Sequence, residues 1–105
     1  MSAAAALPPV VNNEAAGRFE LTLDGHTAYA EYRELATGIL FPHTEVPREL
    51  EGRGVGSTIV REALGFAREQ GQPVIPVCTF VAGYIRRHPE THDLVHPDYR
   101  KALGI

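Results

Sequence analysis

The sequence predicts one small α/β domain, an α/β sandwich built in the order β-β-β-α-β-α. Three observations predict it. Polar and apolar residues alternate over 18–34, apolar residues recur at helical spacing over 57–70, and a short apolar run follows at 74–78. A chain of 105 residues, 44% of them hydrophobic, has the length for one core but not for two. We expect a flexible tail over residues 1–16 and a single domain over 17–105.

An antiparallel hairpin is expected at the start of this domain. Residues 18–23 alternate between polar and apolar, and Asp24-Gly25 then gives a strong two-residue turn signal. Alternation resumes over 26–34. One side of this second strand would carry Ala28, Ala30 and Tyr32, and the other Tyr29 and Glu31.

A third strand and a crossover helix follow the hairpin. The strand is expected over 39–46, with an irregularity at Pro42, because proline has no N–H to donate to a sheet. The helix is expected from Ser57 to Gln70 and ends at Gly71. Since a helix connects them, the buried strand at 74–78 should pair parallel with the third strand.

A second helix is expected over 80–87, capped by Thr79 and ending before His88-Pro89. Residues 90–105 are polar and interrupted by proline, so any structure there would depend on docking against the rest.

Composition argues against several classes of function. The net charge of −3 argues against a general nucleic-acid-binding protein, which needs a surplus of basic residues. No apolar run approaches the length of a membrane span. The single cysteine, Cys78, excludes an internal disulfide and fits the reducing cytoplasm, where we place the protein.

The stretch from Glu49 to Ser57 carries the clearest functional signal. Gly52, Gly54 and Gly56 alternate there, so the backbone can turn tightly with its amides uncovered. The first amides of the following helix lack internal partners, and the helix dipole adds positive charge at that end. Such a turn predicts a site for a phosphate or diphosphate group.

Two familiar phosphate motifs do not fit this stretch. The phosphate loop of nucleoside triphosphatases needs a lysine before Ser57, where Gly56 stands. The dinucleotide fingerprint needs a third glycine where Ile59 stands.

With these elements placed, the chain resembles the GNAT superfamily of acyl-CoA-dependent N-acetyltransferases. It looks most like a short single-domain branch that carries His43-Thr44-Glu45-Val46-Pro47, then the glycine turn, then a strand with a cysteine. The resemblance covers residues 43–89, about half of the chain. It implies a minimal GNAT-like sandwich that binds acetyl-CoA and moves its acetyl group to an unidentified amine, on a small molecule or a protein.

The resemblance also implies which residues bind the coenzyme. In the superfamily, backbone amides of a Gln/Arg-x-x-Gly-x-Gly/Ala turn hold the CoA diphosphate, and a strand pairs with the pantetheine arm. Glu51 departs from the pattern, because a carboxylate repels a diphosphate; Arg48 or Arg53 can compensate. The coenzyme-binding candidates are Thr44, Val46, Arg48, Gly52, Arg53, Gly54, Val55, Gly56, Ser57 and Thr58.

Four side chains are catalytic candidates. The branch places a cysteine at Cys78, which can line the thioester pocket, carry a transient acetyl group or only pack in the core. Tyr84 falls where many members place a tyrosine that protonates the departing thiolate, although it can equally pack on the sheet. Glu45 and His43 share a strand face, and either can take a proton from the amine; each can also be a plain surface or hydrogen-bonding group.

Other polar groups have simpler interpretations. Arg86-Arg87 suits a helix C-terminus, although a CoA phosphate contact is an alternative. His88, His92 and His96 recur every four residues, but Pro89 and Pro97 argue against one helix face, and we expect no metal site.

A rival function is a CoA-binding sensor or interaction module without turnover. It is favoured by Glu51 and by the absence of helices between the hairpin and the third strand, where larger members of the superfamily build their acceptor wall.

Overall fold

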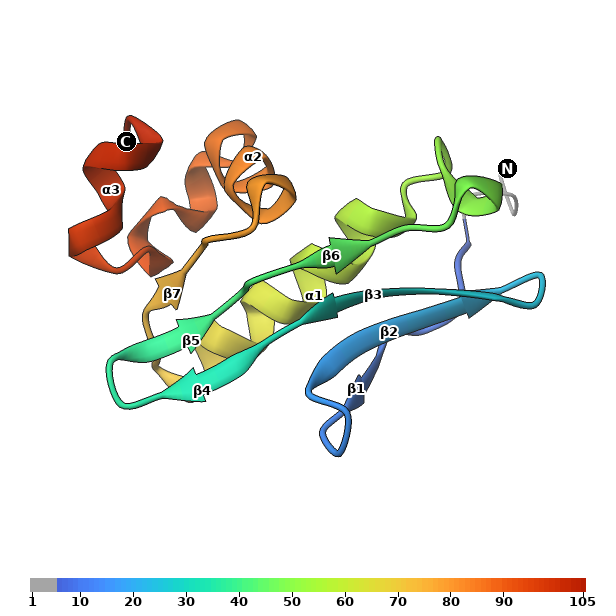
Figure 1. Cartoon of the computed structure of the whole chain (residues 1–105). Coiled ribbons are helices and arrows are strands. Elements are labelled where there is room, and N and C mark those ends of the chain that lie inside the picture. Colours follow the sequence, from blue (N-terminus) through green and yellow to red (C-terminus); the bar gives the residue numbers. More distant parts are fainter. Residues whose placement is uncertain (1–5) are drawn as a thin grey trace.

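The computed structural model describes residues 6–105, in which a long helix lies behind two small sheets (Figure 1). The first sheet is antiparallel throughout, with strand order β1-β2-β3-β6. Asp24 and Gly25 close the β2–β3 hairpin, both with positive φ, as its two-residue turn requires. The strands of this sheet are β1 (Val11–Asn13), β2 (Arg18–Leu23), β3 (His26–Glu31) and β6 (Thr44–Glu45).

The second sheet has the order β4-β5-β7. Its strands are β4 (Arg33–Leu35), β5 (Gly38–Leu40) and β7 (Val74–Ile75). β4 pairs antiparallel with β5, and β5 pairs parallel with β7 through the Ile39↔Val74 register, as the crossover helix predicted. Gly38 lies so close to the β7 side that an added Cβ would sit 2.5 Å from the carbonyl oxygen of Pro73.

The helical elements are the 3-10 turn η2 (Arg48–Leu50), α1 (Val55–Gln70), α2 (Thr79–Arg87), the 3-10 segment η3 (Pro89–Leu94) and α3 (Pro97–Leu103). α1 is amphipathic and ends at Gly71 in the left-handed conformation, as expected. None of the helices formed by residues 6–105 combines the length and the apolar character needed to cross a bilayer.

The core lies between α1 and the inner faces of both sheets. Ala28 and Ala30 are fully buried, which confirms the alternation that the sequence predicted. Bulky aliphatic side chains of α1 fill the space behind them, and Phe19, Tyr32 and Phe66 form an aromatic group with ring centroids 5.0 to 5.7 Å apart. Because both sheets share this one core, the described chain forms a single packed unit.

Two of the expected strands are each divided between the sheets. The second expected strand is interrupted at Tyr32, where β3 ends and β4 begins. The third is interrupted after Leu40, and Pro42 lies in the gap between β5 and β6, so the irregularity expected there is confirmed. Each interruption moves the chain from one sheet to the other.

Several expected boundaries need correction. β1 pairs with β2, so a flexible tail up to residue 16 is wrong for Val11–Asn13; residues 1–5 lie outside the described residues. α1 begins at Val55 rather than Ser57, because Gly54 rather than a polar side chain precedes it. β7 ends at Ile75, and Cys78 rather than Thr79 is the residue before α2. α3 forms in the polar C-terminal segment, where proline begins it and Gly104 ends it.

Candidate active site

The two sheets separate at one point, and that point defines the site. Phe41 accepts the Cys78 amide at 2.8 Å and donates its own amide to Ile75 at 3.0 Å, which extends the parallel pairing beyond β5 and β7. From there the chain continues as β6 toward β3 on one side and as α2 on the other (Figure 1). No backbone hydrogen bond within the described chain joins Thr44–Val46 to α2. β6 therefore presents an unpaired edge.

The ladder register shows which backbone groups lie on that edge. The amide of Glu31 donates to the carbonyl of His43 at 2.8 Å, and Tyr29 faces Glu45 in the same ladder. In an antiparallel pair, hydrogen-bonded and non-hydrogen-bonded residues alternate. The N–H and C=O groups of Thr44 and Val46 therefore point away from β3 and toward the opening, which is what strand-like pairing with an extended ligand requires.

The glycine turn lies at the far end of this edge. Gly52 and Gly54 have φ of 78° and 76°, a left-handed conformation that favours glycine. Helix α1 begins immediately after, without a side-chain cap. Within residues 6–105, no carbonyl or side chain accepts a hydrogen bond from the first amides of α1, those of Val55, Gly56 and Ser57. Unpaired amides at the positive end of a helix dipole are the kind of group that binds an anion.

A hollow of about 280 Å³ lies over this turn. Val46 and Phe80 form its apolar side, and a Cβ at Gly56 would lie 2.6 Å from the end of the Phe80 ring and 3.2 Å from Val46. Gly56 is therefore needed for close packing as well as for access to its amide. Thr58, another candidate, turns its hydroxyl back to the Gly54 carbonyl at 2.8 Å, so its side chain closes the first turn of α1.

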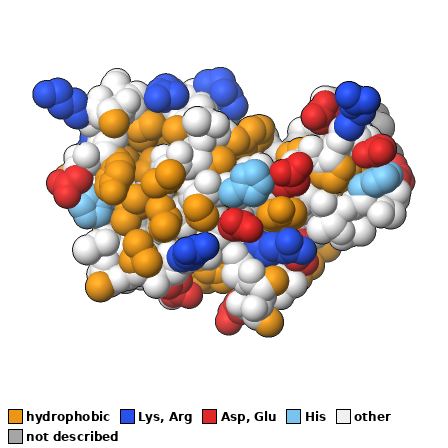
Figure 2. Space-filling model, in the orientation of Figure 1, with side chains coloured by type: hydrophobic (Ala, Val, Ile, Leu, Met, Phe, Trp, Pro, Cys, Tyr) orange, Lys and Arg blue, Asp and Glu red, His pale blue; other side chains and the backbone are white. Residues whose placement is uncertain are grey.

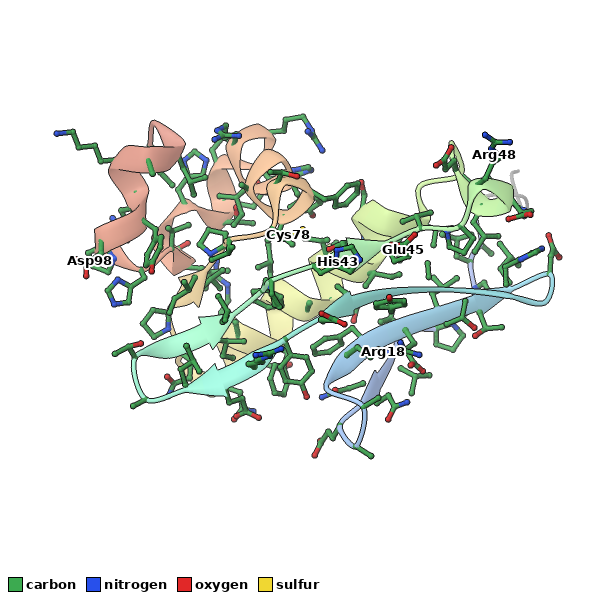
Figure 3. All side chains as sticks on the ribbon, in the orientation of Figure 1. Arg18, His43, Glu45, Arg48, Cys78 and Asp98 are labelled. Carbon is green, nitrogen blue, oxygen red and sulfur yellow. The ribbon has the colours of Figure 1, made fainter. Side chains whose placement is uncertain are left out.

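The charged candidates around the turn are arranged unequally. Glu51 lines the hollow and so lies beside the expected diphosphate position. Arg53 donates to Asp24 at 3.0 Å and so ties the glycine turn to the tip of the β2–β3 hairpin. Arg48 is exposed on η2 and forms no ion pair with any residue of 6–105 (Figure 3). Of the two arginines expected to offset Glu51, only Arg48 is without an acidic partner.

Cys78 lies at the inner end of the opening. Its side chain is 8% exposed, and Sγ donates a hydrogen bond to Oγ1 of Thr44 at 3.4 Å. Cys78 comes directly before the first residue of α2. The thiol therefore lies between the open edge of β6 and the start of α2. From β6 the backbone continues to the glycine turn.

His43 and Glu45 lie together on the outer side of β6 (Figure 3), as the strand alternation predicted. Nε2 of His43 is 3.0 Å from Oε1 of Glu45, and both side chains are about half exposed. The Tyr29 ring meets the imidazole edge-on with centroids 6.1 Å apart. The guanidinium of Arg18 lies over the Tyr29 ring, 4.2 Å from its centroid. The pair can accept a proton on the imidazole and stabilise the charge with the carboxylate.

Tyr84 is not brought to this group. It lies six residues along α2 from Cys78, which corresponds to about 9 Å of rise and about 120° around the helix axis. Its ring stacks on His88 with centroids 3.8 Å apart, and it lines a different hollow, between α1, α2 and η3. Burial raises the pKa of the phenol above its usual value.

The repeated histidines have structural partners. His88 and His92 each bond a backbone carbonyl of α2, at 2.7 and 2.8 Å, and His96 accepts the Asp98 amide at the start of α3. No group of three or more His, Cys, Asp or Glu side chains in the described residues is placed to hold a metal ion.

Comparison with known proteins agrees with this geometry. Residues 18–94 match the model of the family described as GCN5-related N-acetyl-transferase, well over half of the chain. The chain belongs to this family. A comparison with curated proteins finds no match. Membership of the GCN5-related family supports a general acetyltransferase role, and the family typically uses acetyl-CoA.

Two contributors to this site could not be named from the sequence. Phe80 borders the glycine turn, but it belongs to no recognisable sequence motif. The one available signal was its spacing of four residues from Tyr84, which puts both side chains on the same face of α2. Tyr29 meets His43 because β3 and β6 are neighbours, which the sequence does not state. Pairing of distant strands decides such contacts.

Proposed function

We propose that this protein binds acetyl-CoA along the open edge of β6 and transfers the acetyl group to an amine. The observation that carries the proposal is the continuity of the site. Val46 borders the glycine turn, and Thr44, two residues earlier on the same strand, contacts the thiol of Cys78. One extended molecule with a diphosphate at one end and a thioester at the other fits this line.

The residues of the chain fit such a molecule from end to end. The free amides of Val55, Gly56 and Ser57 would hold the diphosphate. The backbone of Thr44 and Val46 would pair with the amide-containing arm, and Phe80 would cover it. Acetyl-CoA supplies an acyl group activated as a thioester, whose reactive end would lie near Cys78 and Thr44.

Two chemical routes fit the same geometry. In the direct route, the amine nitrogen bonds to the acetyl carbon as the carbon–sulfur bond to CoA breaks. The amine proton passes to His43, assisted by Glu45, and CoA leaves as a thiolate that takes up a proton to become the free thiol. In the covalent route, the Cys78 thiol first exchanges its proton for the acetyl group, so that CoA leaves as the free thiol, and the amine then takes the acetyl group from Sγ.

The acceptor side favours a large amine. In the described chain no helix precedes η2, and the side chains of His43 and Glu45 on the outer face of the first sheet are about half exposed. A protein amine can approach such a face without a pocket built around it. A small amine remains the second class of acceptor to test.

A non-catalytic CoA-binding module is the alternative function. The observation that favours it is Glu51 on the border of the glycine-turn hollow, since repulsion of the diphosphate is poorly suited to an enzyme that must capture its coenzyme.

Calorimetry and mass spectrometry test the proposal. Titration with CoA should release heat, and incubation with acetyl-CoA and a panel of peptide and small amines should add one acetyl group to an amine. Acetylation of the protein that disappears in Cys78→Ala identifies the covalent route. Full transfer by Cys78→Ala supports the direct route. Binding without any transfer supports the module, and absence of CoA binding contradicts both functions.

A further inference from the structure

The outer face of the second sheet, opposite α1, carries an apolar strip. Ile39 and Val74 pack into the core, so the residue after each of them faces the other side of the sheet. β4 adds a leucine to the same outer side, because Leu35 pairs with Gly38, two residues before Leu40. The apolar strip consists of Leu35, Leu40, Ile75 and, just beyond β7, Val77.

Part of this strip is left in contact with water. Leu35 is 45% exposed and Val77 is 57% exposed, although both are large aliphatic side chains. Figure 2 shows hydrophobic side chains gathered over the second sheet, beside the histidine and acidic side chains. Exposed apolar side chains that cluster on one face often mark a binding surface.

The strip ends where the candidate site begins. The amide of Cys78 donates to the carbonyl of Phe41 in the last link of the parallel pairing. Leu40 and Val77 come directly before these two residues in the sequence. His43 lies three residues beyond Leu40, at most about 10 Å along an extended chain. An extended molecule that lies on the strip is therefore within reach of the imidazole.

The charge near the imidazole suits a cationic amine. Arg18 is held by Glu20 at 2.5 Å. Within residues 6–105, Glu31 forms no ion pair, and Glu45 pairs with the imidazole rather than with an arginine. Arg33 lies on the outer side of β4, so positive charge borders the strip itself. Carboxylates without an arginine partner therefore lie at the reacting end, where they attract a protonated amine.

The strip is too small to hold a second copy of the chain. A stable dimer buries roughly 800 Å² on each partner. The strip has four side chains, of which Ile75 is buried and Leu40 half-buried, and these expose far less area than a dimer needs. Weak and reversible docking suits a substrate, which must leave after each turnover.

From these features we infer that the apolar strip docks an apolar segment of the acceptor protein, and that a lysine near this segment reaches His43 and Glu45. The inference rests on the proposed function. The acetyl carbon exchanges its bond to the CoA sulfur for a bond to the lysine nitrogen. The amine proton passes to His43, and CoA takes up a proton and leaves as the free thiol. The strip selects which protein is acetylated and takes no part in the chemistry.

Peptides capped at both ends test this inference, because lysine is then their only amine. One peptide carries leucine three positions from the lysine on either side, about 10 Å along an extended chain, and the matched peptide carries serine there. Release of the CoA thiol gives the rate, and the mass of the peptide confirms the product. We expect kcat/KM of the wild type to be about tenfold higher for the leucine peptide.

Substitutions in the strip locate the docking. Leu35→Ser and Val77→Ser should each lower kcat/KM for the leucine peptide about fivefold, and should leave the serine peptide and the CoA affinity unchanged. Both positions are exposed, so we expect these variants to fold. Val11→Ser is the matched control, because Val11 is also 57% exposed but lies on β1, at the far edge of the first sheet.

Several results would overturn the inference and leave the proposed function intact. Equal rates for the two peptides would show that no apolar segment docks, and a preference that survives both strip variants would place the docking elsewhere. An equal loss with both peptides would make the strip a support of the fold. Faster transfer to the free N-terminus of a peptide without lysine would contradict the choice of amine.

Two further measurements separate the remaining outcomes. Light scattering that shows a dimer in the wild type and a monomer in Val77→Asp would mean that a second copy covers the strip, which contradicts the inference. If CoA binds but no amine receives an acetyl group, the proposed transfer fails and this inference fails with it.

Discussion

The two sheets differ in what they present on the face opposite α1. The outer side of the first sheet carries Arg18, Glu20, Tyr29 and Glu45, joined by hydrogen bonds, ring contacts and the imidazole of His43. The outer side of the second carries Leu35, Leu40 and, beyond β7, Val77, which is 57% exposed. Figure 2 shows hydrophobic side chains gathered over the part of this face where the second sheet lies, next to the charged and histidine side chains.

This contrast shows how so small a chain brings the candidate site together. The two sheets come from strands that change sheet midway, and the change after Phe41 leaves the edge of β6 open. Groups that can move protons lie on the first sheet, at His43 and Glu45, and the thiol of Cys78 lies where the second sheet ends. The site exists only because the sheets stay separate.

Substitution of Gly38 should produce the largest effect and should break the second sheet. Gly38→Ala places a Cβ 2.5 Å from a backbone oxygen and leaves alanine at φ 148°, so we expect a loss of about 3 kcal/mol of unfolding free energy. Gly25→Ala, in the hairpin of the first sheet, meets nothing within 4 Å and should cost about 1 kcal/mol. Urea unfolding measures both, and equal losses would contradict this dependence on close backbone approach.

Substitution of His43 should separate proton transfer from binding. If the outer face of the first sheet is the acceptor side, His43→Gln should lower kcat/KM about 100-fold, with little change in CoA affinity. Glu31→Gln, on the same outer face of the neighbouring strand, is the control. It should change kcat/KM and CoA affinity less than twofold, because substitutions of surface groups away from a site have small effects. A loss of CoA affinity that matches the loss of activity would show that His43 supports the fold instead.

Substitution of Glu51 should sharpen the choice between enzyme and module. Glu51→Gln removes a negative charge beside the proposed diphosphate position and should raise CoA affinity roughly fivefold, about 1 kcal/mol of screened repulsion. Glu34→Gln, an exposed carboxylate on β4, is the matched control and should leave it unchanged. The gain should shrink as salt concentration rises. A loss of affinity would mean that the carboxylate takes part in binding.

Substitution of the Arg68–Asp93 ion pair, which ties α1 to the C-terminal segment, should have the smallest effect on stability. The hydrogen bond from Arg68 lowers the pKa of Asp93 below its ordinary value. Its stabilising contribution is therefore full above the pH range in which the unfolded carboxyl titrates and is lost as the pH falls through the lowered pKa. In thermal unfolding experiments, the melting temperature of Asp93→Asn should fall slightly less steeply with decreasing pH than that of the wild type. Arg68→Gln should behave in the same way. Both groups are exposed, so the difference should be small.

Much of the local structure could be predicted from the sequence. Alternation placed β2 and β3, and the glycines and the 3.6-residue period placed the turn and α1 within two residues. Strand alternation predicted that His43 and Glu45 share a face, and the structure adds the 3.0 Å contact between them. β1 could not be predicted, because Val11–Asn13 lacks a periodic pattern and is ordered only by pairing with β2. The same holds for α3, a short helix that docks against the rest through Leu103.

Residue type and short spacing along the chain were enough to predict most of the elements, the glycine turn and the family. Which candidate residues meet depends on how the elements pack in three dimensions. It brought Cys78 to Thr44, 34 residues away, and it placed Tyr84 in the groove beside α1. The physical reason is that contacts between distant residues are set by sheet pairing and by the rotation of a helix against its neighbours, and neither is encoded in the spacing of residues along one segment.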